Sequence, residues 1–230
     1  MWPLQIVRYV HTLLLSRKNI DPSISRFLTS SLPSSRAIAN TQRYCVIDLE
    51  TTGLEPQKDH IISVAWLIVE NGRIAMQTAQ HHYVHSRLGV GQSATIHQIR
   101  DCDLDVAMPL GQVLTGLLED CKDCVLVFHN ASLDKRFLDK ACRAYFGIPL
   151  LRPVIDTLWL ERQWFMQRNL VIKSGILRLA SCRRRYGLPD YDAHNALVDA
   201  LATAELLLAM IAKRNRTTCR LDSLLFNTFF

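Results

Sequence analysis

The sequence predicts an α/β domain in which a mixed sheet of five strands is flanked by helices. Two apolar segments joined by the turn dipeptide Asn71-Gly72 indicate an antiparallel hairpin. Short apolar runs then alternate with segments of helical periodicity, which is the order of strands and helices in α/β domains. A meander of three strands followed by this alternation favours a sheet that combines antiparallel and parallel neighbours.

Each predicted strand is a short apolar run bounded by polar or turn-forming residues. In chain order the five strands are predicted at residues 44–49, 61–70, 73–85, 124–128 and 154–155.

The predicted helices are segments in which apolar residues recur every three or four positions. They are expected at residues 94–100, 109–120, 132–146, from 155 through 167, at 176–186 and 196–212, with short helices at 1–15 and from residue 25. Pro109 favours a first helical turn, and Gly147 and Gly187 favour helix ends. The core stripe of the last helix is expected to consist of Leu197, Leu201, Ala204, Leu208 and Ile211.

Composition divides the chain into a main domain and two terminal segments. Residues 43–213 carry all five predicted strands, whereas residues 1–42 read as a helical extension and linker, and residues 214–230 as a tail. The tail is expected to pack on the domain rather than to dock on a partner. The net charge of +6 suits a partner that carries phosphates, although a generically basic protein explains it equally well.

The seven cysteines point to a reducing compartment. Their odd number and scattered positions favour buried free thiols, and the pair Cys121 and Cys124 has no second pair nearby with which to bind zinc. No apolar run is long enough for a transmembrane helix, so no membrane partner is expected. The expected location is the cytoplasm. The basic, serine-containing residues 1–43 would also suit a mitochondrial transit peptide.

Two acids interrupt the first predicted strand at its end. Asp48 and Glu50 share one face because side chains alternate along a strand, and they lie roughly 7 Å apart along it. Two partly buried carboxylates on one face repel each other, and a divalent cation such as Mg²⁺ would resolve the repulsion. If the strand ends at Leu49, both acids are solvated, and the pair alone does not decide between these alternatives.

Further acids and a histidine follow at two later positions. Asp134 begins a predicted helix after the fourth strand, where an acid is favourable without any function. His194 and Asp199 differ by roughly 140° on one helix and therefore cannot converge within it. They can converge if Asn195 caps the helix and His194 precedes it.

Together these segments resemble the motifs of the DnaQ-like, or DEDDh, 3′→5′ exonucleases. The three motifs correspond to residues 48–54 (Asp-Leu-Glu-Thr-Thr-Gly-Leu), 128–134 (Phe-His-Asn-Ala-Ser-Leu-Asp) and 194–199. Residues 94–99 and 155–158 are similar to further family segments, although Gln98 stands where the family usually has glycine. The resemblance covers roughly residues 43–212 and is greatest to the proofreading epsilon subunit of bacterial DNA polymerase III. Each motif is weak alone, but their order is specific.

The resemblance implies a ribonuclease H-like fold and a two-metal active site. Asp48, Glu50, Asp134 and Asp199 would hold two divalent ions, Mg²⁺ or Mn²⁺, and His194 would be the general base that deprotonates the attacking water. The reaction would release nucleoside 5′-monophosphates from single-stranded 3′ ends, with DNA the first choice. The residues expected to contact the substrate are Thr51, Thr52, Leu54, His97 and Asn130. Asp156 is expected to be structural, as a cap of the following helix.

Several alternatives stay open on the sequence alone. The substrate could be RNA, as in exonucleases of the RNase T or oligoribonuclease type. The chain could also be a non-catalytic nucleic-acid-binding module that associates with a polymerase, or a phosphatase with Asp48 as its nucleophile. A polymerase or another protein could bind the N-terminal extension or the C-terminal tail. The triplet Arg183-Arg184-Arg185 could contact phosphates or form a solvated helix face.

Overall fold

The fold is built on a five-stranded mixed sheet. The computed structural model describes residues 22–85, 107–192 and 195–226. The strands are β1 (Tyr44–Thr51), β2 (Ile61–Glu70), β3 (Arg73–Tyr83), β4 (Val125–Phe128) and β5 (Val154–Asp156), in the order β3-β2-β1-β4-β5. The β3-β2 and β2-β1 pairs are antiparallel, whereas β1-β4 and β4-β5 are parallel. The predicted mixed sheet and its five strands are therefore confirmed.

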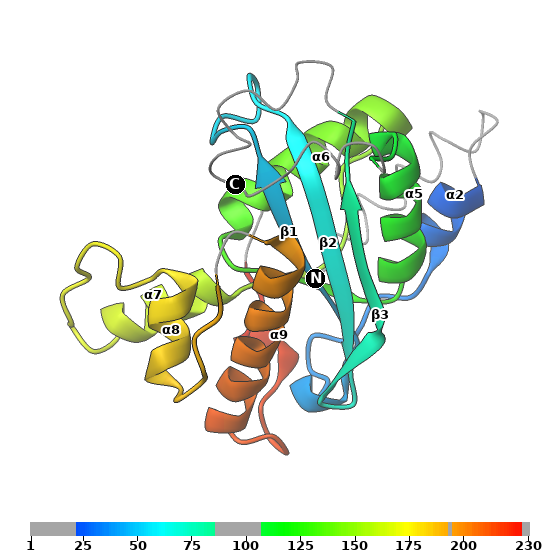
Figure 1. Cartoon of the computed structure of the whole chain (residues 1–230). Coiled ribbons are helices and arrows are strands. Elements are labelled where there is room, and N and C mark those ends of the chain that lie inside the picture. Colours follow the sequence, from blue (N-terminus) through cyan, green and yellow to red (C-terminus); the bar gives the residue numbers. More distant parts are fainter. Residues whose placement is uncertain (1–21, 86–106, 193–194, 227–230) are drawn as a thin grey trace.

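Helices cover both faces of the sheet (Figure 1). One face carries α2 (Pro22–Thr29), α5 (Leu110–Cys121) and α6 (Ala131–Phe146); the other carries α7 (Thr157–Met166), α8 (Leu179–Arg185) and α9 (Ala196–Lys213). Two single-turn 3₁₀ helices, η1 (Ala39–Thr41) and η2 (Leu221–Ser223), flank the domain. Alternation along β1 explains the two layers, because Cys45 and Ile47 enter the first core and Tyr44 and Val46 the second.

Local turn chemistry fixes several element ends. Asn71 and Gly72 have φ values of 51° and 68°, as a tight hairpin turn with left-handed residues requires, so the predicted hairpin is confirmed. Gly147 ends α6 at φ 74°. The helix predicted from residue 176 begins only at Leu179, because residues 173–178 form two turns instead. The helices predicted at 1–15 and 94–100 lie outside the described residues.

The predicted core stripe of α9 is partly wrong. Ala204 and Ile211 are buried as expected, but Leu197, Leu201 and Leu208 are only half-buried. The fully buried positions of α9 instead include Thr203, Leu206 and Met210. Because α9 is apolar around most of its circumference, periodicity alone could not select the packed side.

Both described terminal segments pack on the domain. In α2, Ile24, Phe27 and Leu28 are buried in the core beside α5. The buried Arg152 donates to the Phe27 carbonyl at 2.9 Å, and its guanidinium lies 4.7 Å from the centre of the Phe27 ring. In the tail, Leu221 and Leu224 are buried and the Phe226 amide donates to the Val154 carbonyl at 2.7 Å.

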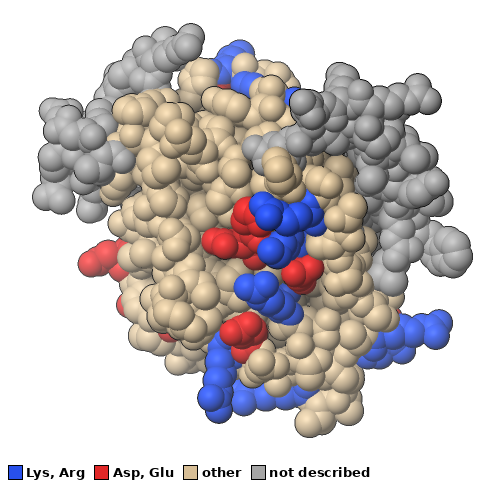
Figure 2. Space-filling view, turned by 90° about the vertical axis from the view of Figure 1, so that its right-hand side faces the viewer, with Lys and Arg blue, Asp and Glu red and all other residues tan. Residues whose placement is uncertain are grey.

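The described thiols are buried, and on one face the surface charges are mixed. All six described cysteines are free and buried, and burial raises the pKa of Cys121 and Cys124, which makes a redox role for this pair unfavourable. On the face that carries α2 and α5, basic and acidic side chains are interspersed (Figure 2), and Arg26 and Lys122 both pair with Glu119. Among the described helices, none has the length and apolar character needed to span a bilayer.

Candidate active site

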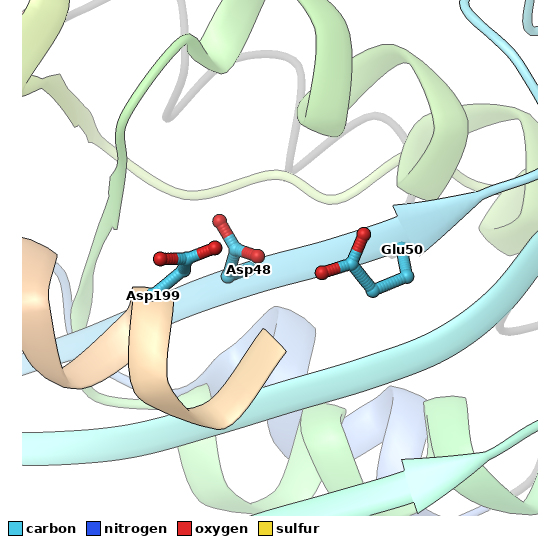
Figure 3. Close-up of side chains that lie close together, drawn as sticks. All are labelled: Asp48, Glu50 and Asp199. Atoms are coloured by element: carbon cyan, nitrogen blue, oxygen red, sulfur yellow. The ribbon is translucent and has the colours of Figure 1, made fainter. Parts of the chain in front are cut away.

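Three carboxylates converge where β1 passes the first turn of α9. Ligand oxygens of Asp48, Glu50 and Asp199 all lie within 4.8 Å of one another (Figure 3). Asp48 and Glu50 share one face of β1, as alternation predicted. Their neighbours on β2 are Ala65 and Ser63, whose small side chains leave room beside the carboxylates.

The N-cap of α9 brings Asp199 into this cluster. The side chain of Asn195 accepts hydrogen bonds from the amides of Leu197 (3.1 Å) and Val198 (3.2 Å), so the helix begins at Ala196. The predicted cap is therefore confirmed, and with it the condition under which His194 and Asp199 can converge. His194 itself lies outside the described residues, and its place in the site stays a prediction.

Burial and mutual repulsion raise the pKa values of the site carboxyls. Burial, followed by the charge of Asp199, raises the pKa of Glu50 to about 7. Burial raises the pKa of Asp48 well above its ordinary value, and Asp134, Asp199 and Glu50 add to the shift. Among the residues that the structure describes, no cationic side chain is a cause of either shift. This is the donor set for a hard divalent cation, which would compensate the repulsion and favour the charged forms.

Asp134 borders the same cluster from α6. It is buried, and burial raises its pKa with further contributions from Asp156 and Glu50. The N-cap of its helix is Asn130, which has φ 92°, a left-handed value that asparagine tolerates better than most residues. The charge of Asp134 therefore repels the charges of Asp48 and Glu50. Asp134 is not one of the three residues whose oxygens lie within 4.8 Å of one another.

Asp156 connects the starts of two helices. One carboxylate oxygen accepts from the Asn130 amide and the other from the Ala131 amide, each at 3.0 Å, at the start of α6. The same carboxylate accepts from the amides of Leu158 (3.0 Å) and Trp159 (3.3 Å) at the start of α7. The predicted capping role is confirmed, and the additional link to α6 shows how Asp156 also positions the helix that carries Asp134.

The loop that follows β1 presents an exposed apolar side chain four residues after Glu50. Asp59 organises this loop: it accepts from the Glu55 amide at 2.8 Å and from the Thr52 hydroxyl at 3.3 Å. A Cβ atom at Gly53 would lie 2.5 Å from the Asp59 carboxylate, so any larger residue there would displace that side chain. Leu54 is 74% exposed. Sequence reasoning identified the stretch but missed Asp59, which no local pattern singles out.

His129 was also missed, and it is a structural residue. Its Nε2 lies 2.9 Å from the Leu177 carbonyl, which can only accept, so Nε2 carries the proton and Nδ1 accepts from the Thr157 hydroxyl at 2.8 Å. Burial lowers the pKa of His129 to about 4, so the ring is neutral near pH 7. His129 thus connects the segment before α8 to the end of β4. His97 lies outside the described residues.

Most of the arginine triplet of α8 is used inside the protein and is free neither to contact phosphates nor to form a solvated helix face. Arg183 is buried and donates to Glu205 at 2.6 Å and to the Ala202 carbonyl at 2.6 Å on α9. Arg185 donates to the buried Glu161 on α7 at 2.8 Å. Only Arg184 is exposed, in a pair with Asp190. Two of the three therefore cross-link helices, because α8 is packed between α7 and α9.

Comparison with known proteins places these features in one family. A family model described as exonuclease matches residues 45–207. PolC-type DNA polymerase III of Staphylococcus epidermidis is 37% identical over 169 residues, which are 73% of this chain and 11% of that protein. The PolC-type polymerase of Thermotoga maritima is 32% identical over 169 residues, which are 73% of this chain and 12% of that protein. The chain thus spans only a small part of the length of these relatives.

Solved structures share the fold at low sequence identity. The nuclease domain of 3′hExo, a DEDDh family member bound to rAMP, has a TM-score of 0.63 at 16% identity and covers 80% of this chain and 98% of that chain. Escherichia coli exonuclease I in complex with a dT13 oligonucleotide has a TM-score of 0.63 at 15% identity and covers 77% of this chain and 42% of that chain. These neighbours confirm the predicted ribonuclease H-like arrangement of sheet and helices.

Proposed function

The chain belongs to the exonuclease family whose model matches residues 45–207, and from this premise we propose that it is a metal-dependent 3′→5′ exonuclease. It removes nucleoside 5′-monophosphates from single-stranded 3′ ends. The observation that carries the proposal is the meeting of Asp48, Glu50 and Asp199, whose oxygens lie within 4.8 Å of one another. A phosphodiester hydrolase of this family needs such a site, whereas a binding module has no need to bury mutually repelling acids.

Asp48, Glu50, Asp134 and Asp199 are the residues that we assign to hold two divalent ions, Mg²⁺ or Mn²⁺. Carboxylate oxygens suit these hard ions, and a bound cation would favour the charged forms that burial and mutual repulsion disfavour. Such ions, when bound, supply positive charge that acidifies the attacking water and stabilises the scissile phosphate.

His194 is the residue that we assign to take the proton from the attacking water at a ring nitrogen. It directly precedes Asn195, the N-cap of α9, and the same helix carries Asp199 in its first turn. An imidazole suits the task because its ordinary pKa lies near neutrality. The histidine of the second motif, His129, is kept neutral by burial, and both of its ring nitrogens are engaged by Leu177 and Thr157, so it does not compete for this role.

The terminal nucleotide is held by the loop after β1 and by the start of α6. The exposed Leu54 contacts the terminal base; Thr51 directly follows Glu50 in the chain, and Asn130 is the N-cap of the helix that carries Asp134. The Thr52 hydroxyl is engaged, since it donates to Asp59 and accepts from the His60 amide at 3.0 Å. Thr52 therefore acts by fixing the loop. His97 completes the set that the family resemblance implies.

DNA is the first choice of substrate, because the relatives of highest identity reported above are DNA polymerase III chains. An RNA exonuclease is the second candidate, favoured by the neighbour bound to rAMP, which this fold covers over 98% of its length. By analogy with the same relatives, a polymerase is a candidate partner for the N-terminal extension. A cytoplasmic location also stays part of the proposal.

The test uses 5′-labelled single-stranded DNA and RNA of equal sequence with Mg²⁺ or Mn²⁺. A ladder that shortens from the 3′ end, and that Asp48→Asn and His194→Ala both abolish, supports the proposal. The preferred polymer identifies the substrate class. If neither polymer is shortened while the protein still binds Mn²⁺, the nucleic-acid-binding module is the better account.

A further inference from the structure

A long basic stretch lies between the third and fourth acidic ligands in the chain. Residues 162–189 contain seven cations and no aspartate or glutamate, although the whole chain has a net charge of only +6. This segment, which comprises the end of α7, the loop to α8, and α8 itself, is therefore a strongly basic part of the described chain. Such a concentration attracts a polyanion.

The seven cations fall into two groups. Arg183, Arg184 and Arg185 pair with Glu205, Asp190 and Glu161, so their charges are compensated within the protein. The other four are exposed and make no ion pair with any residue of the described part; they are Arg162, Arg168, Lys173 and Arg178. Residues 162–178, which carry these four, are called the basic loop below.

The basic loop also exposes apolar side chains. Leu170, Val171 and Ile172 are consecutive and exposed, with Val171 at 76%, and Met166 is exposed beside them. Arg168 lies over the ring of Trp164, at 4.5 Å from its centre. Exposed apolar groups in such a run mark a binding surface. Cations that alternate with apolar and aromatic groups fit single-stranded nucleic acid, which offers phosphates and unpaired base faces together.

One end of the basic loop is tied to the segment that leads into α6. At its end, the Leu177 carbonyl accepts from His129, which directly precedes Asn130, the N-cap of the helix that carries Asp134. At its start, the Leu170 amide donates to the Phe165 carbonyl at 3.0 Å. Figure 1 shows α7 and α8 beside α9, with the loop between them projecting away from the sheet. The hydrogen bond to His129 thus ties the end of the loop to the helix that carries Asp134, the site acid on α6.

We propose that the basic loop binds the substrate strand on the 5′ side of the nucleotide that is removed. Arg162, Lys173 and Arg178 contact its phosphates, and Leu170 and Val171 contact its bases. This inference rests on the proposed exonuclease function. Its consequence is a dependence on strand length: a substrate of one nucleotide uses the acidic cluster alone, whereas a longer strand also uses the loop.

The test compares two triple variants with the same change in net charge. Arg162→Gln/Lys173→Gln/Arg178→Gln changes the basic loop, and Arg26→Gln/Arg36→Gln/Lys122→Gln changes cations outside it. Fluorescence anisotropy measures the Kd of a labelled oligothymidylate of about 16 nucleotides, with Ca²⁺ in place of Mg²⁺ to prevent cleavage. Turnover of the p-nitrophenyl ester of thymidine 5′-monophosphate measures the acidic cluster alone.

The loop variant is expected to raise the Kd about tenfold and to reduce the slope of log K against log salt by about 2, since each phosphate contact on a single strand contributes about 0.7. Its ester turnover should equal that of wild type. Leu170→Ser/Val171→Ser should weaken binding without changing the slope, because it removes no charge.

Equal Kd values and slopes for the two triple variants would overturn the inference. So would a loop variant that binds the oligonucleotide normally but no longer binds vesicles of anionic phospholipid, because the surface would then serve a membrane. Wild-type protein that hydrolyses neither the ester nor the oligonucleotide contradicts the exonuclease function instead. The two failures are therefore distinguishable.

Discussion

Glu50 on β1 and Asp199 on α9 lie with carboxylate oxygens within 4.8 Å, and the charge of Asp199, after burial, helps to raise the pKa of Glu50 to about 7. This proximity is unfavourable for the metal-free fold whenever both groups are charged. The cluster of acids therefore lowers the free energy of unfolding of the metal-free protein, and this effect can be measured.

The first prediction concerns pH and the metal-free protein. The pKa of Glu50 in the folded state is raised, so the folded state binds more protons than the unfolded state between about pH 4.5 and 7. The free energy of unfolding in EDTA should fall across this window as pH rises, by up to about 3 kcal/mol, and level off above it. Thermal unfolding from pH 5 to 8 measures the change.

Adding Mn²⁺ should restore the Tm more at pH 8 than at pH 5, because protons compete with the ion for the same carboxylates. Asp199→Asn should flatten the decline in EDTA. A Tm that does not change with pH in EDTA, in a protein whose site is intact, would show that these acids do not repel each other.

The second prediction separates catalysis from stability. Asp48→Asn removes a buried charge from the cluster, so it should raise the Tm in EDTA while lowering kcat on an oligonucleotide by about 10³-fold or more. Asp190→Asn is the matched control, since its carboxylate pairs with the exposed Arg184. Loss of both activity and metal-free stability in Asp48→Asn would instead indicate a merely structural acid.

The third prediction concerns Asp156. Its carboxylate accepts from amides at the starts of both α6 and α7, so Asp156→Ala leaves buried donors without a partner. Unfolding in urea should show a loss of about 3 kcal/mol. A loss below about 0.5 kcal/mol, the range of ordinary surface changes, would contradict the proposed link between the two helices.

The fourth prediction concerns α2. Phe27 is fully buried beside α5 and under the guanidinium of Arg152, so Phe27→Ala should destabilise the domain by about 3–5 kcal/mol. Arg26→Ala, in the same helix but exposed, should change stability by less than about 0.5 kcal/mol. Similar small effects of both substitutions would show that α2 is not part of the core.

Strong local signals explain which parts of the fold could be predicted. The run of β2 is apolar at nearly every position and ends at Asn71-Gly72, and its predicted bounds match the observed ones. The cap at Asn195 follows from side-chain chemistry and from the need to bring His194 and Asp199 together. The acids at 48, 50 and 199 were predicted by the order of motifs.

Tertiary packing decided the rest. The packed side of α9 could not be read from a helix that is apolar around most of its circumference. Arg183 and Arg185 look like surface cations in the sequence, but Glu205 and Glu161 pair with them only because α8 packs between two helices. The contact of His129 with Leu177 joins distant segments, so no local pattern reports it.

The measurement that tests the central claim most directly is the identity of the released product. A single-stranded oligonucleotide labelled at its 3′-terminal nucleotide is incubated with wild-type protein and Mg²⁺ or Mn²⁺, with EDTA and Asp199→Asn as controls. We predict that the label appears as a nucleoside 5′-monophosphate from the first cleavage onward, and that both controls abolish its release. Label released only as longer fragments, as a 3′-monophosphate, or equally well in EDTA would contradict a metal-dependent 3′→5′ exonuclease.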